Sequence, residues 1–150
     1  MIRNTLTAIA LTLGFVSPAF ADMIEKVSPH SVSVTMDRLS AAVEGAGATV
    51  FARIDHAGGA ASIDMELRPT QLLIFGNPKL GTPAMLDGQT AGLDLPLRVL
   101  AYERADGVVH LAYHAPADLA ETHALPGDAK YLTMMTGALD KLTSKAVAAE

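Results

Sequence analysis

The stretch that decides the fold is Thr70–Pro83, which reads TQLLIFGNPKLGTP. Residues 71–75 are almost entirely apolar, and the run stops at Gly76-Asn77-Pro78. A short apolar run that ends at such a turn sequence predicts a buried β-strand. Because both alternating sets of its side chains are apolar, we expect this strand to lie in the middle of a sheet.

The residues after this strand follow the pattern of a capped helix start. The side chain of Asn77 can accept a hydrogen bond at a helix N-terminus, and Pro78 suits the first helical position. A helix N-terminus can also bind an anion, to which Lys79 would add a positive charge. Two interpretations therefore stay open, a structural cap and a site for a small anionic ligand.

Composition limits the classes of partner. The 150-residue chain has a net charge of −5, an aromatic content of 5% and no cysteine. An acidic chain with few aromatic residues argues against nucleic acid as a partner. Without cysteine there are no disulfides and no thiolate chemistry. Half of the residues are hydrophobic, which favours one globular domain over residues 22–150.

The N-terminal residues 1–21 have the order of a secretory signal peptide. Arg3 precedes the apolar run Thr5–Val16, and Ala19-Phe20-Ala21 supplies a cleavage site of the Ala-x-Ala type. The run is shorter than the roughly 20 residues that span a membrane. We expect cleavage after Ala21, export to the periplasm and no membrane span in the mature chain, with an uncleaved N-terminal anchor as the alternative.

Periodicity predicts an α+β domain. The sheet is expected to be antiparallel or mixed, with two main helices on one face. The segment 57–65 is expected to be a short helix or an ordered loop. The predicted strands are 26–35, 48–56, 70–75, 95–104 and 108–114, and the predicted main helices are 36–46, which Thr35 would cap, and 128–146.

Alternation along the strands predicts two different sheet faces. The aliphatic face, expected to pack on the helices, comprises Val50, Ala52, Ile54, Leu72, Ile74, Leu97, Val99, Ala101, Val109, Leu111 and Tyr113. The mixed face comprises Phe51, Arg53, Asp55, Leu73, Phe75, Asn77, Arg98, Leu100, Tyr102, His110 and His114. An exposed face of this mixed kind indicates a homodimer interface, a surface covered by loops or a ligand cleft. The candidate ligand-binding residues are Arg53, Asn77, Lys79, Arg98 and His110.

Evidence for catalysis is sparse. Asp55, His56 and Asp94 are the candidate catalytic residues, because a histidine near a carboxylate can transfer protons near neutral pH. The chain has no Gly-x-Ser-x-Gly elbow, phosphate-binding loop or dinucleotide fingerprint. A small hydrolase or isomerase that uses His56 with a carboxylate is therefore an alternative, nothing requires an enzyme, and no cofactor is expected.

A metal site is the third alternative. Histidine and methionine suit copper, and the chain has five histidines and seven methionines. On a strand, however, His110 and His114 lie roughly 13 Å apart, which is too far to share one ion. No Met-x-x-Met or His-x-His sequence supports copper handling. We therefore assign no metal ligand, and His56, His110 and His114 are the residues that such a function would use.

Three phrases resemble the domain-of-unknown-function 302 family: Phe51–His56 (FARIDH), Leu67–Gly81 (LRPTQLLIFGNPKLG) and Leu93–Pro96 (LDLP). The resemblance implies a TATA-binding-protein-like fold, with the order strand, helix, four strands, helix, often as a homodimer. It implies no activity and no nucleic-acid role. The residues that match the recurring phrases are Asp55, His56, Arg68, Pro69, Gly76, Asn77, Pro78, Asp94 and Pro96. The leading hypothesis is a periplasmic, non-enzymatic binding or interaction domain.

Overall fold

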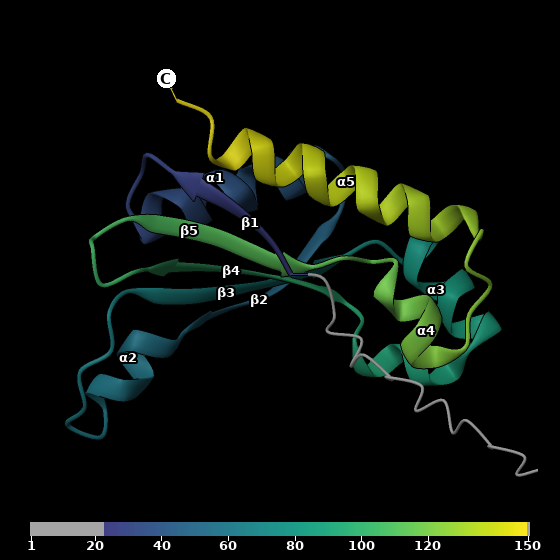
Figure 1. Cartoon of the computed structure of the whole chain (residues 1–150), viewed down its shortest axis with the longest axis horizontal. Coiled ribbons are helices and arrows are strands. Elements are labelled where there is room, and N and C mark those ends of the chain that lie inside the picture. The colour runs from purple at the N-terminus through teal and green to yellow at the C-terminus, as the bar shows by residue number, and fades with distance from the viewer. Residues whose placement is uncertain (1–22, 150) are drawn as a thin grey trace, which may run out of the picture.

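The computed structural model describes residues 23–149, so the expected signal peptide, residues 1–21, lies outside the described residues. Five strands form one sheet, and two long helices accompany it (Figure 1). The elements are β1 (Met23–Ser28), α1 (Val32–Gly45), β2 (Thr49–Asp55), α2 (His56–Ala61), β3 (Thr70–Gly76), α3 (Pro78–Asp87), the 3-10 helix η1 (Gln89–Leu93), β4 (Leu97–Glu103), β5 (Val109–His114), α4 (Asp118–His123) and α5 (Lys130–Ala146).

The sheet has the strand order β1-β5-β4-β3-β2, and every neighbouring pair is antiparallel. This confirms the predicted α+β class and resolves the sheet as antiparallel. The main elements follow the predicted order of strand, helix, four strands and helix, with the shorter helices inserted between them. β3 is an interior strand between β2 and β4, as its apolar sequence predicts.

Helices α1 and α5 pack side by side on one face of the sheet, which we call the helix face (Figure 1). The core joins Met36 and Leu39 of α1 to Leu139 of α5, and all three side chains are buried against the strands. Burying each such side chain stabilises the fold by about 1.5–3 kcal/mol. No helix packs in this way on the opposite face among residues 23–149, and we call that side the open face.

The prediction for β3 was wrong in its phase. Leu73 and Phe75, expected on the mixed face, belong to the core under α1 and α5, while Leu72 and Ile74 lie on the open face. The two sets have similar hydrophobicity, so alternation within β3 cannot show which set is buried. The cross-strand pairs decide it, because Leu73 is opposite Val99 and Leu72 is opposite Leu100.

A β-bulge reverses the phase of β2. The register with β3 shifts between Val50 and Ala52, so Val50 packs on the core while Ala52 and Ile54 reach the open face. An extra residue in one strand changes the side to which the following side chains point. Arg53 was therefore wrongly predicted on the mixed face: its guanidinium lies on the helix side, 2.5 Å from Asp37 of α1.

The first helix begins earlier than predicted. Ser31 is its N-cap, with its hydroxyl accepting a hydrogen bond from the N–H of Val34, whereas Thr35 was expected in that role. Thr35 instead lies inside α1, is buried, and donates to the carbonyl of Ser31. Its hydroxyl also lies 2.7 Å from that of Ser28. These local hydrogen bonds satisfy the buried hydroxyl of Thr35, which the sequence pattern wrongly indicated as a helix cap.

Candidate functional site

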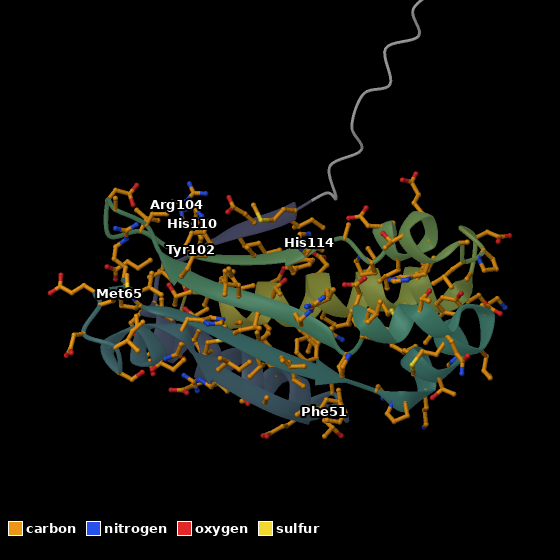
Figure 2. The ribbon with its side chains drawn as sticks, turned by 90° about the horizontal axis from the view of Figure 1, so that it is seen from below. Phe51, Met65, Tyr102, Arg104, His110 and His114 are labelled. Atoms are coloured by element: carbon orange, nitrogen blue, oxygen red, sulfur yellow. The ribbon has the colours of Figure 1, made fainter. Side chains whose placement is uncertain are left out.

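The open face is the side of the sheet that α1 and α5 leave uncovered in the described chain (Figure 1). Figure 2 views the molecule from this side, with the sheet in front of the long helices. The strand register and the alternation of side chains place these residues on it: Met23, Glu25, Val27, Ala52, Ile54, Thr70, Leu72, Ile74, Arg98, Leu100, Tyr102, His110, Ala112 and His114. The face thus combines aliphatic side chains with ionisable ones.

One half of the open face is apolar. Ile54, Leu72 and Leu100 form a row across β2, β3 and β4, because each is the cross-strand partner of the next. Ile74 and Ala52 form a second pair beside this row. Ile54 remains 38% exposed. This contiguous aliphatic area is typical of a contact surface rather than of a solvated sheet face.

The other half carries an ionic cluster on β1, β4 and β5. Tyr102 donates a short hydrogen bond to Glu25, and the guanidinium of Arg104 lies 2.6 Å from the same carboxylate. The ring of His110 stacks on Tyr102 with its centroid 5.7 Å away. Figure 2 shows Tyr102, Arg104 and His110 gathered at one end of the sheet. Ala112 lies between Glu25 and Leu100 in the register, and its small side chain leaves room for Tyr102 to cross β5.

This cluster changes the ionisation of its carboxylate. The hydrogen bond from Tyr102 and the neighbouring Arg104 guanidinium hold the pKa of Glu25 below its ordinary value, although partial burial opposes them. His110 is only 8% exposed, and its Nδ1 has no hydrogen-bond partner among residues 23–149. The cluster orders this end of the face and keeps a negative charge next to a buried imidazole.

A second polar group lies near the other end of the sheet, where β4 begins. Asp94 contacts two basic side chains: its Oδ1 accepts from Arg98 at 2.8 Å, and its Oδ2 lies 2.7 Å from Nε2 of His123. The Nδ1 of His123 lies 3.1 Å from the hydroxyl of Thr90. The side chain of His123 is 4% exposed, so this contact ties α4 to η1 and the start of β4.

Two cavities adjoin the sheet at this end. The larger, about 370 Å³, has a mostly apolar lining that includes Phe51, Met85 and Pro96. The smaller, about 200 Å³, lies between the sheet and α4, and we call it the α4 pocket. Its walls include Arg98, His114 and other residues from the ends of β4 and β5. The large cavity offers apolar contact, and the α4 pocket offers charged groups.

The three predicted catalytic residues do not form one group. Asp55 is the N-cap of α2, where its carboxylate accepts from the N–H of Gly58 at 3.0 Å, and His56 is the exposed first residue of that helix. Asp55 pairs with Gln71, where β3 begins. Asp94 precedes β4, which begins at the opposite end of the sheet, where β3 ends. A pair of His56 and Asp94 is therefore wrong. The histidine that Asp94 contacts is His123, which lies 29 residues further along the chain, so no local sequence pattern indicates the contact.

The predicted anion site at Asn77 is a cap. Its side chain accepts from the N–H of Lys79 at 2.9 Å, Pro78 occupies the first turn, and the N–H groups of Leu80 and Gly81 bond to the Asn77 carbonyl. These bonds use the N–H groups that an anion would need. Lys79 is exposed on α3. The predicted binding residues Arg98 and His110 both lie on the open face, at different levels of the sheet.

For metals, no group of three or more His, Cys, Asp or Glu side chains within residues 23–149 is arranged to hold an ion. His110 and His114 lie on the same strand with their levels separated by Ala112. Also within that range, the structure has no helix with the length and hydrophobicity needed to cross a lipid bilayer.

Comparison with known proteins identifies the family. The profile described as domain of unknown function DUF302 matches residues 24–142. The chain belongs to the DUF302 family. Its fold is similar to that of an uncharacterised DUF302 protein from Bacillus stearothermophilus, seen in a crystal structure, with a TM-score of 0.74 and 14% identity over 83% of this chain and 97% of that one. This likeness supports the fold alone.

Three relatives from Brucella are more similar in sequence. A protein of Brucella suis named fluoride-specific ion channel FluC 1 is 46% identical over 112 residues, which are 73% of this chain and 44% of that protein. Proteins of Brucella abortus (FluC 1) and Brucella melitensis (FluC 2) match with the same identity over 42% of their lengths. The DUF302 chain thus spans less than half the length of these relatives.

Proposed function

We propose that this DUF302 protein is an exported, non-enzymatic interaction domain that pairs with a second copy of itself through the open face. The observation that supports the proposal is the aliphatic row Ile54, Leu72 and Leu100 on a sheet face that the two long helices α1 and α5 leave uncovered (Figure 1). A monomer seldom leaves an apolar area of this size in contact with water.

The area of the face fits such a pairing. Five strands about 4.8 Å apart, with six or seven residues rising about 3.3 Å each, give a face of roughly 500 Å² in plan. Side-chain relief increases the accessible area toward the roughly 800 Å² per partner of a standard interface. The segment after α2 lies on the side of the sheet away from α5 (Figure 1). Its exposed residues Ile63, Met65 and Leu67 would add further apolar contact.

The charges on the face also suit a second copy. In a two-fold interface the same patch is used twice, so it must not bring an unpaired charge against its own image. Glu25 and Arg104 already neutralise each other, as do Asp94 and Arg98. The apolar half can therefore be buried while the charged side chains keep partners within their own chain.

The test is the mass of the purified chain in solution, measured by size-exclusion chromatography with light scattering over a range of concentrations. Ile54→Asp on the open face and Val34→Asp on α1 form a matched pair, since the two residues are 38% and 43% exposed. We expect a dimer for the wild type and Val34→Asp, and a monomer for Ile54→Asp. A wild-type chain that stays monomeric at about 1 mM, where pairing would need only about −4 kcal/mol, would refute the proposal.

The Brucella relatives favour a second candidate, a role beside a fluoride channel. The supporting observation is the 46% identity to a segment of proteins named as fluoride-specific ion channels. In this function the domain would contact the part of such a channel protein that lies outside the matched 112 residues. Co-elution of this chain with a Brucella suis FluC 1 protein lacking that segment would support it, and separate elution would count against it.

A further inference from the structure

The α4 pocket contains groups of both charges in a small volume. Arg98 and His114 enter it from the sheet, Asp118 enters it from the first turn of α4, and Leu119 and Leu139 supply apolar walls. Its volume is about 200 Å³, which corresponds to about seven water molecules at 30 Å³ each. Sites for drug-sized ligands occupy roughly 300–1,000 Å³, so this pocket suits only a small molecule.

One oxygen in this pocket lacks a partner. The Oδ2 atom of Asp118 is buried and has no hydrogen-bond donor among residues 23–149. Buried polar atoms in native proteins are almost always paired, so such an atom calls for a donor. The Asp118 side chain as a whole is partly exposed, so a rotation of its carboxylate would bring this oxygen to a donor in the pocket. An ammonium group is the best donor for a carboxylate, because the hydrogen bond is then charge-assisted on both sides.

The positive side of the pocket faces the sheet. Leu100 pairs with Ala112, and the same register two residues further on sets Arg98 opposite His114. Arg98 donates one hydrogen bond to Asp94, from Nη2. Because its side chain is still 46% exposed, its other N–H groups can donate to an anion. A guanidinium beside an imidazole matches the two oxygens of a carboxylate.

We propose that the α4 pocket binds a small zwitterion, a short α-amino acid, with its ammonium on Asp118 and its carboxylate between Arg98 and His114. A simple anion would leave the Asp118 oxygen without a donor. Asp94 also lines the pocket and pairs with Arg98, so a simple cation would meet no net repulsion but would leave the remaining N–H groups of Arg98 without an anion. A ligand that carries both charges within a few bonds can pair with Asp118 and with Arg98 at once in so small a pocket.

The experiment is a titration of the ¹⁵N-labelled chain with glycine or L-alanine, followed by amide chemical shifts. We expect saturable shifts in residues 94–98 and 114–122, with a Kd of about 1 mM or tighter. Acetate and methylamine each carry one of the two charges, and we expect them to bind at least about tenfold more weakly, a difference of about 1.4 kcal/mol. Absence of saturable shifts with both amino acids would overturn the proposal.

Two variants localise the site. Asp118→Asn should weaken binding at least about tenfold, whereas Glu121→Gln, an exposed residue on the same helix, should leave it unchanged. If Asp118→Asn fails to fold by circular dichroism, Arg98→Gln takes its place with the same expectation. Unchanged affinity in the folded variant would refute the assignment. Failure here leaves the dimer proposal intact, because the aliphatic row of the open face takes no part in this pocket.

Discussion

Replacing Leu73 by Ala tests the observed phase of β3 against the one that alternation predicts. Leu73 is fully buried between the sheet and the helices, opposite Val99. Its neighbour Leu72 lies on the open face, opposite Leu100, and is only partly buried. The two residues have the same chemistry and adjacent positions, so Leu72→Ala is the matched control.

The expected costs differ because only one substitution leaves a closed cavity. A fully buried Leu→Ala change lowers the free energy of unfolding by about 3–5 kcal/mol. At Leu72 part of the side chain already contacts water, so we expect about 1 kcal/mol in the monomer. For a domain of this size, each kcal/mol shifts Tm by about 3–5 °C, so Leu73→Ala should lower Tm by roughly 10–25 °C.

The assay is urea unfolding followed by far-UV circular dichroism, since the chain has no tryptophan. The dependence of the unfolding free energy on urea concentration should have the same slope in the variants and the wild type. An unchanged slope shows that the substitution lowers stability and does not change the surface exposed on unfolding. Measurement at several protein concentrations separates the monomer cost from any effect of Leu72→Ala on pairing. An equal cost at the two positions, or a larger cost at Leu72 in the monomer, would refute the placement of β3.

Three further predictions follow from named contacts. Because the pKa of Glu25 is lower in the folded chain than its ordinary value of 4.5, its ionised form stabilises the fold at pH values above 4.5. That stabilisation is lost as the pH falls through the lowered pKa. Urea unfolding should therefore show a weaker pH dependence between about pH 5 and 3 for Glu25→Gln than for the wild type. Gly88→Ala would bring a Cβ to 2.9 Å from the carbonyl of His123 and should lower Tm, while Gly59→Ala, with open space around it in α2, should raise stability by up to about 1 kcal/mol. His123→Ala should lower the free energy of unfolding by about 1–3 kcal/mol because it removes a buried side chain together with its contacts to Asp94 and Thr90, and no measurable loss relative to the exposed His56→Ala would contradict the role of His123 as a tie between α4 and η1.

The sequence predicted the faces of β4 and β5 correctly because one set of their side chains is clearly more polar. Arg98, Tyr102 and His110 alternate with Val99 and other aliphatic residues, so the buried set is unambiguous. In β3 both sets are aliphatic, and the choice depends on which one lies opposite the buried side of β4. That information is in the pairing of strands and not in the strand itself.

The contacts of the candidate site could be predicted from the sequence only where both partners lie in the same short segment. The cap at Asn77 was among the two interpretations of its sequence, because a cap is a local structure of three or four residues. The contact of Asp94 with His123 joins η1 and α4 in space, and neither segment has a pattern that indicates the other. Likewise, Glu25 and Arg104 are 79 residues apart, and only the pairing of β5 with both β1 and β4 brings them together.

The bulge in β2 connects the fold to the surface that we propose as an interface. Without the bulge, strict alternation from Val50 would place Arg53 on the open face and direct Ile54 toward the helices. The extra residue at Phe51 lets Val50 complete the core, directs Arg53 to the carboxylate of Asp37, and returns Ile54 to the open face. Phe51 itself remains 57% exposed at the mouth of the large cavity. One inserted residue thus removes a charge from the open face and adds a β-branched aliphatic side chain to it, which is what a surface that pairs with its own copy requires.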